Sequence, residues 1–273
     1  MQKILKIELH RAFINWTFGV SIAIGCTIAI SHLWFQVIPS ICNLDNYLLG
    51  KGEYPVSVFN KWIGGEGISL QSALYNMLLP CLAILPYGDS LFCDKKSGYI
   101  KNILIKTSKK KFFLSKMISA FLSGAVACTV PLLLNLVLSA ACLPSIIPES
   151  SSMTFPLFER SMFSNLFYKY PYRYIFIYLT IIFVFSGLFS CLALGLSYYV
   201  EKKYEIYIIP LIVYMLIDFV AGCIGFDCLS PKSYLRIDQP VPASFEIILI
   251  EYLVGMGLFI CIYCYKGKKD EII

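Results

Sequence analysis

Residues Ile175 to Leu196 read IFIYLTIIFVFSGLFSCLALGL and decide the fold class of this chain. The stretch has no charged residue, and about 20 residues of helix are enough to cross the roughly 30 Å of hydrocarbon in a bilayer. A membrane β-strand would instead alternate apolar and polar residues over about ten positions, and this stretch does not alternate. It therefore predicts a helix that crosses a membrane.

The rest of the chain has a matching composition. Of its 273 residues, 58% are hydrophobic and only 15% are charged, and the mean hydropathy is +0.71. A surface that faces water carries more charge than this. We expect an all-α membrane protein in which residues 1–273 form a single transmembrane domain. Six apolar runs predict its membrane spans: Phe13–Ile38, Leu70–Phe92, Phe112–Leu143, Tyr174–Val200, Tyr207–Phe226 and Phe245–Tyr265.

The positions of lysine and arginine predict the orientation. With six spans and a cytoplasmic N-terminus, most of the 23 Lys and Arg residues fall in cytoplasmic segments, as the positive-inside rule requires. We therefore expect a multi-pass protein of the cell membrane with both termini in the cytoplasm. The net charge of +6 is concentrated in short segments beside the spans. Its expected partner is membrane lipid with anionic headgroups, and nucleic acid is not expected.

Sequence motifs for catalysis are missing from the chain. It has no G-x-x-x-x-G-K-[ST], no H-E-x-x-H and no G-x-S-x-G. His10 and His32 stand far apart and are expected to act as polar anchors at the membrane surface. The 11 cysteines lie mostly inside predicted spans, where they pack as small apolar residues, and Cys261 and Cys264 lack the soluble context of a redox motif. We expect no enzyme activity, no cofactor and no metal site.

Three carboxylates lie inside the predicted spans, where a charge at the helix centre costs about 2.5 to 3.5 kcal/mol. Asp89 is at the cytoplasmic end of the second span, and we expect an ion pair with Lys95 or Lys96 there, although Asp89 is also a candidate for a transport path. Asp218 and Glu251 lie deeper. They line a polar transport path or pair with Tyr and Ser side chains for structure, and the sequence leaves both interpretations open.

The loop between the second and third spans predicts an amphipathic helix at the inner face of the membrane. Tyr99, Ile100, Ile103 and Leu104 recur at helical spacing and form one apolar stripe. Near the N-terminus, a similar pattern predicts a short amphipathic interfacial helix before the first span: Ile4, Leu5, Ile7 and Leu9 are apolar at helical spacing, and Lys3, Lys6 and Glu8 are polar. By its pattern alone, such a helix is expected to lie on anionic lipid.

A motif runs through this loop and the span before it: Leu79-Pro80, Leu85-Pro86-Tyr87-Gly88-Asp89-Ser90-Leu91-Phe92, Asp94, Ser97-Gly98-Tyr99-Ile100-Lys101-Asn102-Ile103-Leu104 and Lys116. It resembles the corresponding stretch of bacterial type-2 ABC transporter permeases, the six-span membrane subunits of exporters of lantibiotics and other peptides. In that family, a cytoplasmic coupling helix between spans 2 and 3 docks on the ATPase. The resemblance implies this role for Asp94, Gly98, Tyr99, Ile100, Ile103 and Leu104.

The same resemblance implies partners. The ATPase of the family is a separate polypeptide, which agrees with the missing phosphate loop. A complete exporter contains two six-span subunits, as a homodimer or a heterodimer, and two ATPase subunits. The expected substrate is a peptide, a lipid or a drug-like compound. Pro80 and Pro86 remove backbone hydrogen bonds from the second span and are expected to kink it beside the coupling helix.

Two other classes of function stay open from the sequence. One is a secondary transporter driven by an ion gradient, with Asp218 and Glu251 as its coupling carboxylates. Against it, the chain has no obvious inverted repeat and no pair of broken helices in corresponding halves. The other is a protein without transport activity, such as an immunity protein, a sensor or an intramembrane enzyme. For an enzyme, the sequence offers no paired catalytic residues.

Overall fold

The computed structural model describes residues 2–41, 56–149, 157, 161–239 and 241–269, with side chains up to residue 261. Every regular element in these ranges is a helix. Four of the described helical segments are long and apolar enough to cross a membrane, as expected for a membrane protein. They are Trp16–Ile41, which joins α2 (Trp16–His32) to the π-helical turn Leu33–Val37, and α8 (Lys109–Cys142), α10 (Pro171–Leu196) and α11 (Glu205–Ile224).

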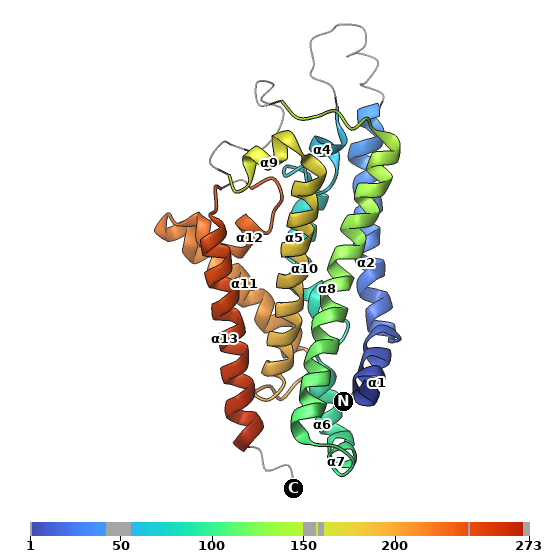
Figure 1. The fold of residues 1–273 in the computed structure, drawn as a ribbon, viewed down its shortest axis with the longest axis vertical. Coiled ribbons are helices and arrows are strands. Elements are labelled where there is room, and N and C mark those ends of the chain that lie inside the picture. The colour runs from blue at the N-terminus through green and yellow to red at the C-terminus, as the bar shows by residue number, and fades with distance from the viewer. Residues whose placement is uncertain (1, 42–55, 150–156, 158–160, 240, 270–273) are drawn as a thin grey trace, which may run out of the picture.

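The remaining described α-helices have 15 residues or fewer, except α13, which has 25. They are α1 (Gln2–Phe13), α4 (Val58–Lys61), α5 (Leu70–Ile84), α6 (Ser90–Lys96), α7 (Tyr99–Leu104), α9 (Ser164–Lys169), α12 (Pro231–Tyr234) and α13 (Phe245–Lys269). Figure 1 shows α6 and α7 at one end of the elongated molecule beside α1, with α4 and α9 toward the other end. We name these the α7 end and the α9 end. The last turn of α13 lies at the α7 end, where α1 begins.

The second predicted run, Leu70–Phe92, is not one helix. α5 ends at Ile84, the chain turns, and α6 follows. Pro86 explains the break, because it has no N–H to donate to the carbonyl of Leu82. The hydroxyl of Ser21 in α2 donates a hydrogen bond of 2.7 Å to that carbonyl instead. A neighbouring helix therefore satisfies the backbone group that the proline leaves open.

The second proline of this region has the same kind of compensation. Pro80 lies inside α5 and cannot donate to the carbonyl of Asn76. The hydroxyl of Tyr214 in α11 donates to this carbonyl at 3.3 Å. Each of these two proline sites in and after α5 is thus tied by a side chain to another long helix, α2 in one case and α11 in the other.

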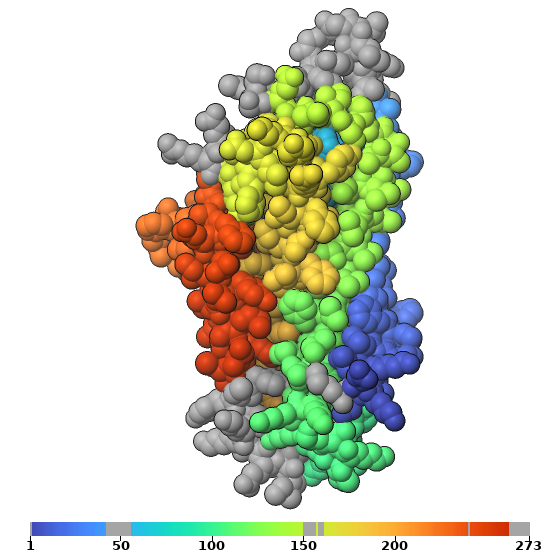
Figure 2. All heavy atoms as spheres, in the orientation of Figure 1, coloured from blue at the N-terminus to red at the C-terminus, as the bar shows by residue number. Residues whose placement is uncertain are grey.

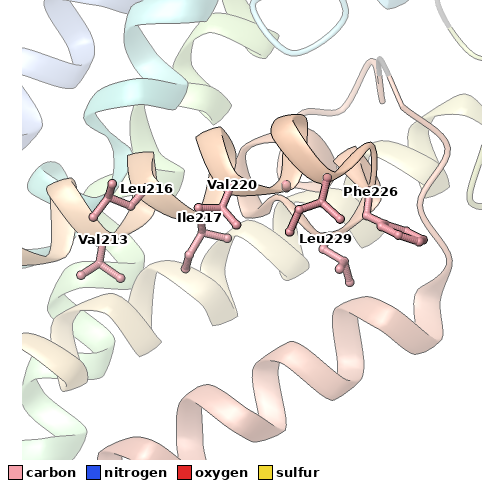
Figure 3. A pocket seen from close by; sticks show the side chains of 8 residues that line it. Val213, Leu216, Ile217, Val220, Phe226 and Leu229 are labelled. Carbon is pink, nitrogen blue, oxygen red and sulfur yellow. The ribbon is translucent and has the colours of Figure 1, made fainter.

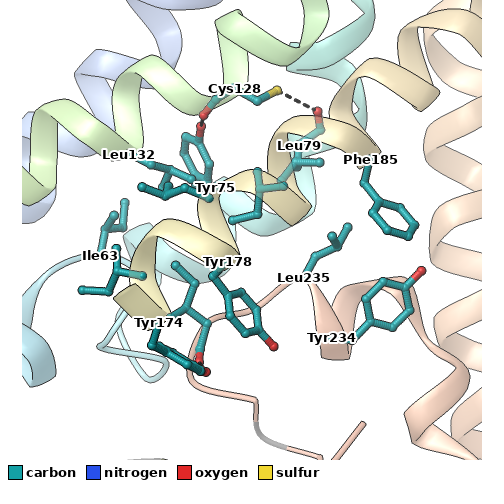
Figure 4. Packing of buried hydrophobic residues seen from close by; sticks show 14 of the residues in the cluster. Ile63, Tyr75, Leu79, Cys128, Leu132, Tyr174, Tyr178, Phe185, Tyr234 and Leu235 are labelled. Carbon is teal, nitrogen blue, oxygen red and sulfur yellow. Dashed lines mark hydrogen bonds between the residues drawn. The ribbon is translucent and has the colours of Figure 1, made fainter. Parts of the chain in front are cut away.

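The core of the α9 half contains aromatic side chains of α5 and α10, which pack with Cys128 and Leu132 of α8 (Figure 4). Tyr75, Tyr174 and Tyr178 are at most 2% exposed, and the hydroxyl of Tyr75 donates to the carbonyl of Cys128. α8 and α10 approach closely because Gly187 has no side chain. A Cβ there would lie 2.5 Å from the ring of Phe121, so this glycine sets the helix spacing.

The N-terminal segment is helical, as the sequence predicts, but its buried face is different from the expected one. Ile7, assigned to the apolar side, is 53% exposed. Glu8 and Ala12 are the buried residues of α1. The helix therefore turns a carboxylate toward the bundle, and this carboxylate has partners there.

Candidate functional site

A cluster of four charged side chains lies at the α7 end, three of them buried and the fourth, Arg11, partly exposed. α1 contributes Glu8 and Arg11, α6 contributes Asp94 and α8 contributes Lys116. Glu8 and Lys116 are 0% exposed and Asp94 is 3% exposed. We call these four residues the four-charge cluster. They join three helices that are far apart along the chain.

Ion pairs link all four members of the cluster. Arg11 meets Asp94 with both guanidinium nitrogens, at 2.7 Å from Nη2 to Oδ1 and 3.2 Å from Nη1 to Oδ2, in the bidentate geometry that favours arginine. Arg11 Nη1 also lies 3.3 Å from Oε1 of Glu8. Lys116 Nζ bonds Oδ2 of Asp94 and lies 3.6 Å from Oε2 of Glu8. The hydroxyl of Tyr87 donates to Glu8 from the α5–α6 turn.

The charges of the cluster balance, because two cations face two carboxylates. Balance is required at this depth, since an unpaired buried charge costs several kcal/mol. Burial lowers the pKa of Arg11, but the hydrogen bond to Asp94 and the neighbouring negative charges outweigh it, and the net shift is upward. Arg11 therefore stays charged and holds α1 against α6.

The loop helix of the sequence prediction is divided in the structure. α6 ends at Lys96 and α7 begins at Tyr99, with Gly98 between them at φ +71°. This is the left-handed region, where glycine avoids the strain that a Cβ would add. Asp94 and the apolar stripe therefore belong to two short helices that meet at Gly98.

The apolar stripe of α7 packs against the protein's own helices. Ile100 is 3% exposed, and Tyr99, Ile103 and Leu104 are partly buried. The guanidinium carbon of Arg11 lies 4.5 Å from the centre of the Tyr99 ring, within cation–π distance. The buried side chains of this second core come from α1, α5–α6, α7, α8 and α10: Ala12, Tyr87, Leu91, Ile100, Phe112, Phe113, Ala120, Leu194 and Tyr198.

The opposite side of α7 is open at the tip of the molecule. Lys101, Asn102 and Lys106 are exposed, and Ile105 is 83% exposed. Figure 2 shows the side chains of this region forming the lower tip beside α1. The part of the α6–α7 pair that a partner can reach therefore combines lysines with one prominent isoleucine. We call these four residues the α7 tip.

Asp89 forms an ion pair, but not with Lys95 or Lys96 as the sequence suggests. Its Oδ2 lies 2.7 Å from Nζ of Lys203, in the loop between α10 and α11. The hydrogen bond to Asp89 raises the pKa of Lys203. Lys96 instead donates to the carbonyl of Glu201 at 3.4 Å. The pair joins the α5–α6 turn to the α10–α11 loop.

Asp218 and Glu251 have separate partners in the segment after α11. Asp218 accepts hydrogen bonds from Ser230 at 2.6 Å and from Lys232 at 2.7 Å. Glu251 in α13 accepts one from the hydroxyl of Tyr234 at 2.6 Å. The contacts with Ser230 and Tyr234 are of the kind that the second interpretation of the sequence expects, in which the two carboxylates pair with Tyr and Ser side chains for structure. They fasten α11 and α13 to the connection between them.

A buried polar group also lies toward the α9 end, and the sequence does not predict it. His32 is 0% exposed, and its Nε2 lies 3.2 Å from Oε2 of Glu66. Lys61 lies 3.0 Å from the other oxygen of Glu66, and the amide of Asn135 donates to the carbonyl of Ala29 at 2.8 Å beside the imidazole. His32 is therefore a buried link between α2 and the α4–α5 connection.

The face of α11 carries an open apolar groove of about 330 Å³ (Figure 3). None of the residues that line the groove is charged. They are Val213, Leu216, Ile217, Val220, Ala221, Ile224, Phe226 and Leu229. Such a surface suits lipid chains or another apolar helix. It has no group that could carry out chemistry. Among the residues that the structure describes, no cluster of His, Cys, Asp and Glu could hold a metal ion.

Comparison with known proteins adds no assignment to this geometry. No protein-family model matches the chain. No curated protein and no solved structure matches it either. In its described residues the chain is all-helical, with four membrane-capable helices and a balanced cluster of charges at the α7 end.

Proposed function

We propose that the chain is the permease subunit of an ABC exporter, energised by a separate ATPase. In this proposal, α2, α5 with the turn after it, α8, α10, α11 and α13 are the six spans. The α7 end lies in the cytoplasm, together with both termini. A second permease subunit, identical or related, completes the transport path for a peptide, a lipid or a drug-like substrate.

The four-charge cluster is the observation that carries the proposal. An exporter of this kind needs a stiff element that passes the movement of the ATPase to the spans. Lys116 and Asp94 bind each other inside the protein, and Arg11 binds Asp94 from α1. A force applied to α6 or α7 therefore reaches α1, which leads into α2, and α8, which is 34 residues long. Both residues of the Lys116–Asp94 pair belong to the motif that resembles the permeases.

The buried stripe changes the expected contact with the ATPase. Because Ile100 and its neighbours pack on the chain's own core, they hold α7 in place. The partner would meet the α7 tip, where Ile105 is 83% exposed between Lys101 and Lys106. An exposed apolar residue within a polar rim is the usual form of an interface anchor. Asp218 and Glu251 have no coupling role in this proposal, since their contacts join α11, α12 and α13.

A co-purification experiment tests the proposal. The full-length tagged chain is extracted from its native membrane, and associated polypeptides with an ATP-binding phosphate loop are identified and assayed. We expect such an ATPase to co-purify with the wild type. Ile105→Asp should reduce the recovered ATPase by at least about tenfold, because losing an interface anchor commonly costs about 2 kcal/mol or more.

The matched control is Ile68→Asp, the same change at a residue that is 101% exposed near the start of α5, away from the α7 tip. It should leave the recovery of the ATPase unchanged. Both variants must reach the membrane in wild-type amounts. Absence of any ATPase from the wild-type sample, or equal recovery with Ile105→Asp, would contradict the proposed function.

A further inference from the structure

A polar cavity of about 370 Å³ lies at the α7 end, beside the four-charge cluster. The α1–α2 corner forms one wall, and the α5–α6 turn and the loop before α11 form the others. Its lining residues are Arg11, Ile14, Asn15, Thr17, Tyr87, Asp89, Ser90, Cys93 and Lys203. We call it the Arg11–Lys203 cavity. What this cavity binds does not depend on whether the chain has an ATPase partner.

The residues around the cavity are of the kind found at the depth of lipid headgroups. Trp16 is 84% exposed and Ile14 is 71% exposed at the corner where α2 begins. Tryptophan at the end of a membrane-capable helix prefers the boundary between headgroups and hydrocarbon. The cavity therefore opens where a headgroup can enter while its acyl chains stay beside α2.

The cavity presents both signs of charge. Arg11 and Lys203 supply a guanidinium and an ammonium group, whose side chains are 34% and 52% exposed. Asp89 supplies a carboxylate that is 8% exposed and that already faces a cation, Lys203, at 2.7 Å. A ligand that matches these charges has an anionic group for the two cations and a cationic donor for the carboxylate.

Ser90 adds a hydrogen-bonding group that the protein itself leaves unused. The residue is 6% exposed and lines the cavity. Its Oγ is buried and has no hydrogen-bond partner within the part of the chain that the structure describes. A buried hydroxyl without a partner is costly. A group bound in the cavity that forms a hydrogen bond with Ser90 would remove this cost.

We propose that the Arg11–Lys203 cavity binds the headgroup of a phospholipid that carries both a phosphate and a primary ammonium, as ethanolamine phospholipids do. The phosphate lies between Arg11 and Lys203, the ammonium donates to Asp89, and Ser90 bonds to the headgroup. The site is neutral, because Arg11, Lys116 and Lys203 balance Glu8, Asp89 and Asp94. A zwitterionic ligand keeps this balance.

Other common headgroups fit the cavity less well. A choline headgroup has the same charges but no N–H, so it cannot donate a hydrogen bond to Asp89. A glycerol headgroup has no cation, so its net negative charge stays unbalanced beside the same carboxylate. Binding should therefore favour ethanolamine over both. A comparison of the three headgroups tests whether the carboxylate of Asp89 selects the ligand.

Native mass spectrometry tests the proposal. The full-length chain is reconstituted into vesicles of phosphatidylethanolamine, phosphatidylcholine and phosphatidylglycerol in equal amounts, and the lipids that stay bound after detergent extraction are identified. We expect one retained ethanolamine lipid per chain, enriched about tenfold over the other two, because a hydrogen bond to a charged group is among the stronger single contacts. Equal retention of the three lipids would mean unspecific annular lipid and would overturn the proposal.

The variants separate the cavity from general membrane charge. Lys203→Gln and Ser90→Ala should each reduce the ethanolamine enrichment at least about threefold. Lys203 is half exposed, and Ser90→Ala removes only one oxygen, so both variants should keep the fold. The matched control is Lys202→Gln, a neighbouring exposed lysine outside the cavity, which should leave the enrichment unchanged. Unchanged enrichment in Lys203→Gln, or an equal loss in Lys202→Gln, would contradict the site.

Discussion

Glu8 and Lys116 are both 0% exposed, which is rare for these two residue types unless they are paired. A balanced pair of this depth adds little stability compared with apolar residues of the same size. Such a pair instead favours the arrangement of helices that pairs every charge, because any other arrangement leaves a charge buried without a partner. At this scale, the charges fix the position of α1 and α6 against α8 and do not strengthen the core.

The first prediction concerns Lys116. Lys116→Met keeps the length of the side chain but leaves Glu8 and Asp94 with one cation for two carboxylates. We expect the free energy of unfolding to fall by about 3–5 kcal/mol, the cost of removing one partner of a buried ion pair. Unfolding of the purified protein in detergent micelles measures the change.

A double variant shows whether charge balance is the cause. Lys116→Met combined with Glu8→Gln restores equal numbers of cations and carboxylates, so it should recover a large part of the lost stability. Lys101→Met, at an exposed position of α7, should change the free energy of unfolding by no more than about 0.5 kcal/mol. A double variant that is even less stable than Lys116→Met would show that packing, and not charge, is the reason.

The elements of this fold are joined where their backbones are irregular. α5 ends before Pro86, and the carbonyl of Leu82 is taken by Ser21 of α2. Thr17 of α2 donates to the carbonyl of Pro86 at 3.1 Å. The break in the second run is therefore a fixed corner held by α2, and it carries the chain from α5 into α6.

The second prediction tests this corner. Ser21→Ala should lower the free energy of unfolding by about 1 kcal/mol, because it leaves the carbonyl of Leu82 without a partner. In a Pro86→Ala background, the same change should cost less, since Ala at 86 can donate its own N–H to Leu82. A double-mutant cycle in detergent micelles measures the coupling. If the effects of the two changes on the free energy of unfolding were additive, Ser21 would not be compensating for the N–H that Pro86 lacks.

Much of the helical layout follows from the sequence, while the contacts between helices do not. Apolar runs predict α8, α10 and α11 to within a few residues, because length and composition suffice for a membrane helix. Periodicity also detects the stripe on α7, but it cannot tell whether such a stripe faces lipid, a partner or the chain itself. The Arg11–Asp94 contact joins residues 83 positions apart, and no local pattern contains that information.

One signal for the buried cluster was present in the sequence. Glu8 lies four residues from both Ile4 and Ala12, so it shares a helix face with apolar residues. A carboxylate on such a face predicts a buried partner. The partner itself could not be identified, because several lysines of the α6–α8 region were equally available. His32 was missed for the same reason, since its partner Glu66 lies in an irregular connection.

At the scale of the whole molecule, the decisive feature is that α1 begins and α13 ends at the same end (Figure 1). The chain therefore traverses the long axis an even number of times. Among the described residues, four helical segments are long and apolar enough to cross a membrane, while α5 is only 15 residues long. A helix of this length is about 22 Å long, which is short of the roughly 30 Å of hydrocarbon. The crossing at α5 is therefore the weakest point of a six-span arrangement.

The last prediction concerns the sidedness of this crossing. Ile68 is 101% exposed before α5, and Ile105 is 83% exposed after α7. Ile68→Cys and Ile105→Cys are made singly in a background without other cysteines. In intact cells, a membrane-impermeant maleimide should label the cysteine at 68 and not the one at 105, because in the proposed six-span arrangement α5 and the turn after it separate them across the bilayer. Opening the membrane should expose position 105, which controls for its reactivity. Labelling of both positions in intact cells would place the two ends of α5 on one side, and the six-span arrangement would then be wrong.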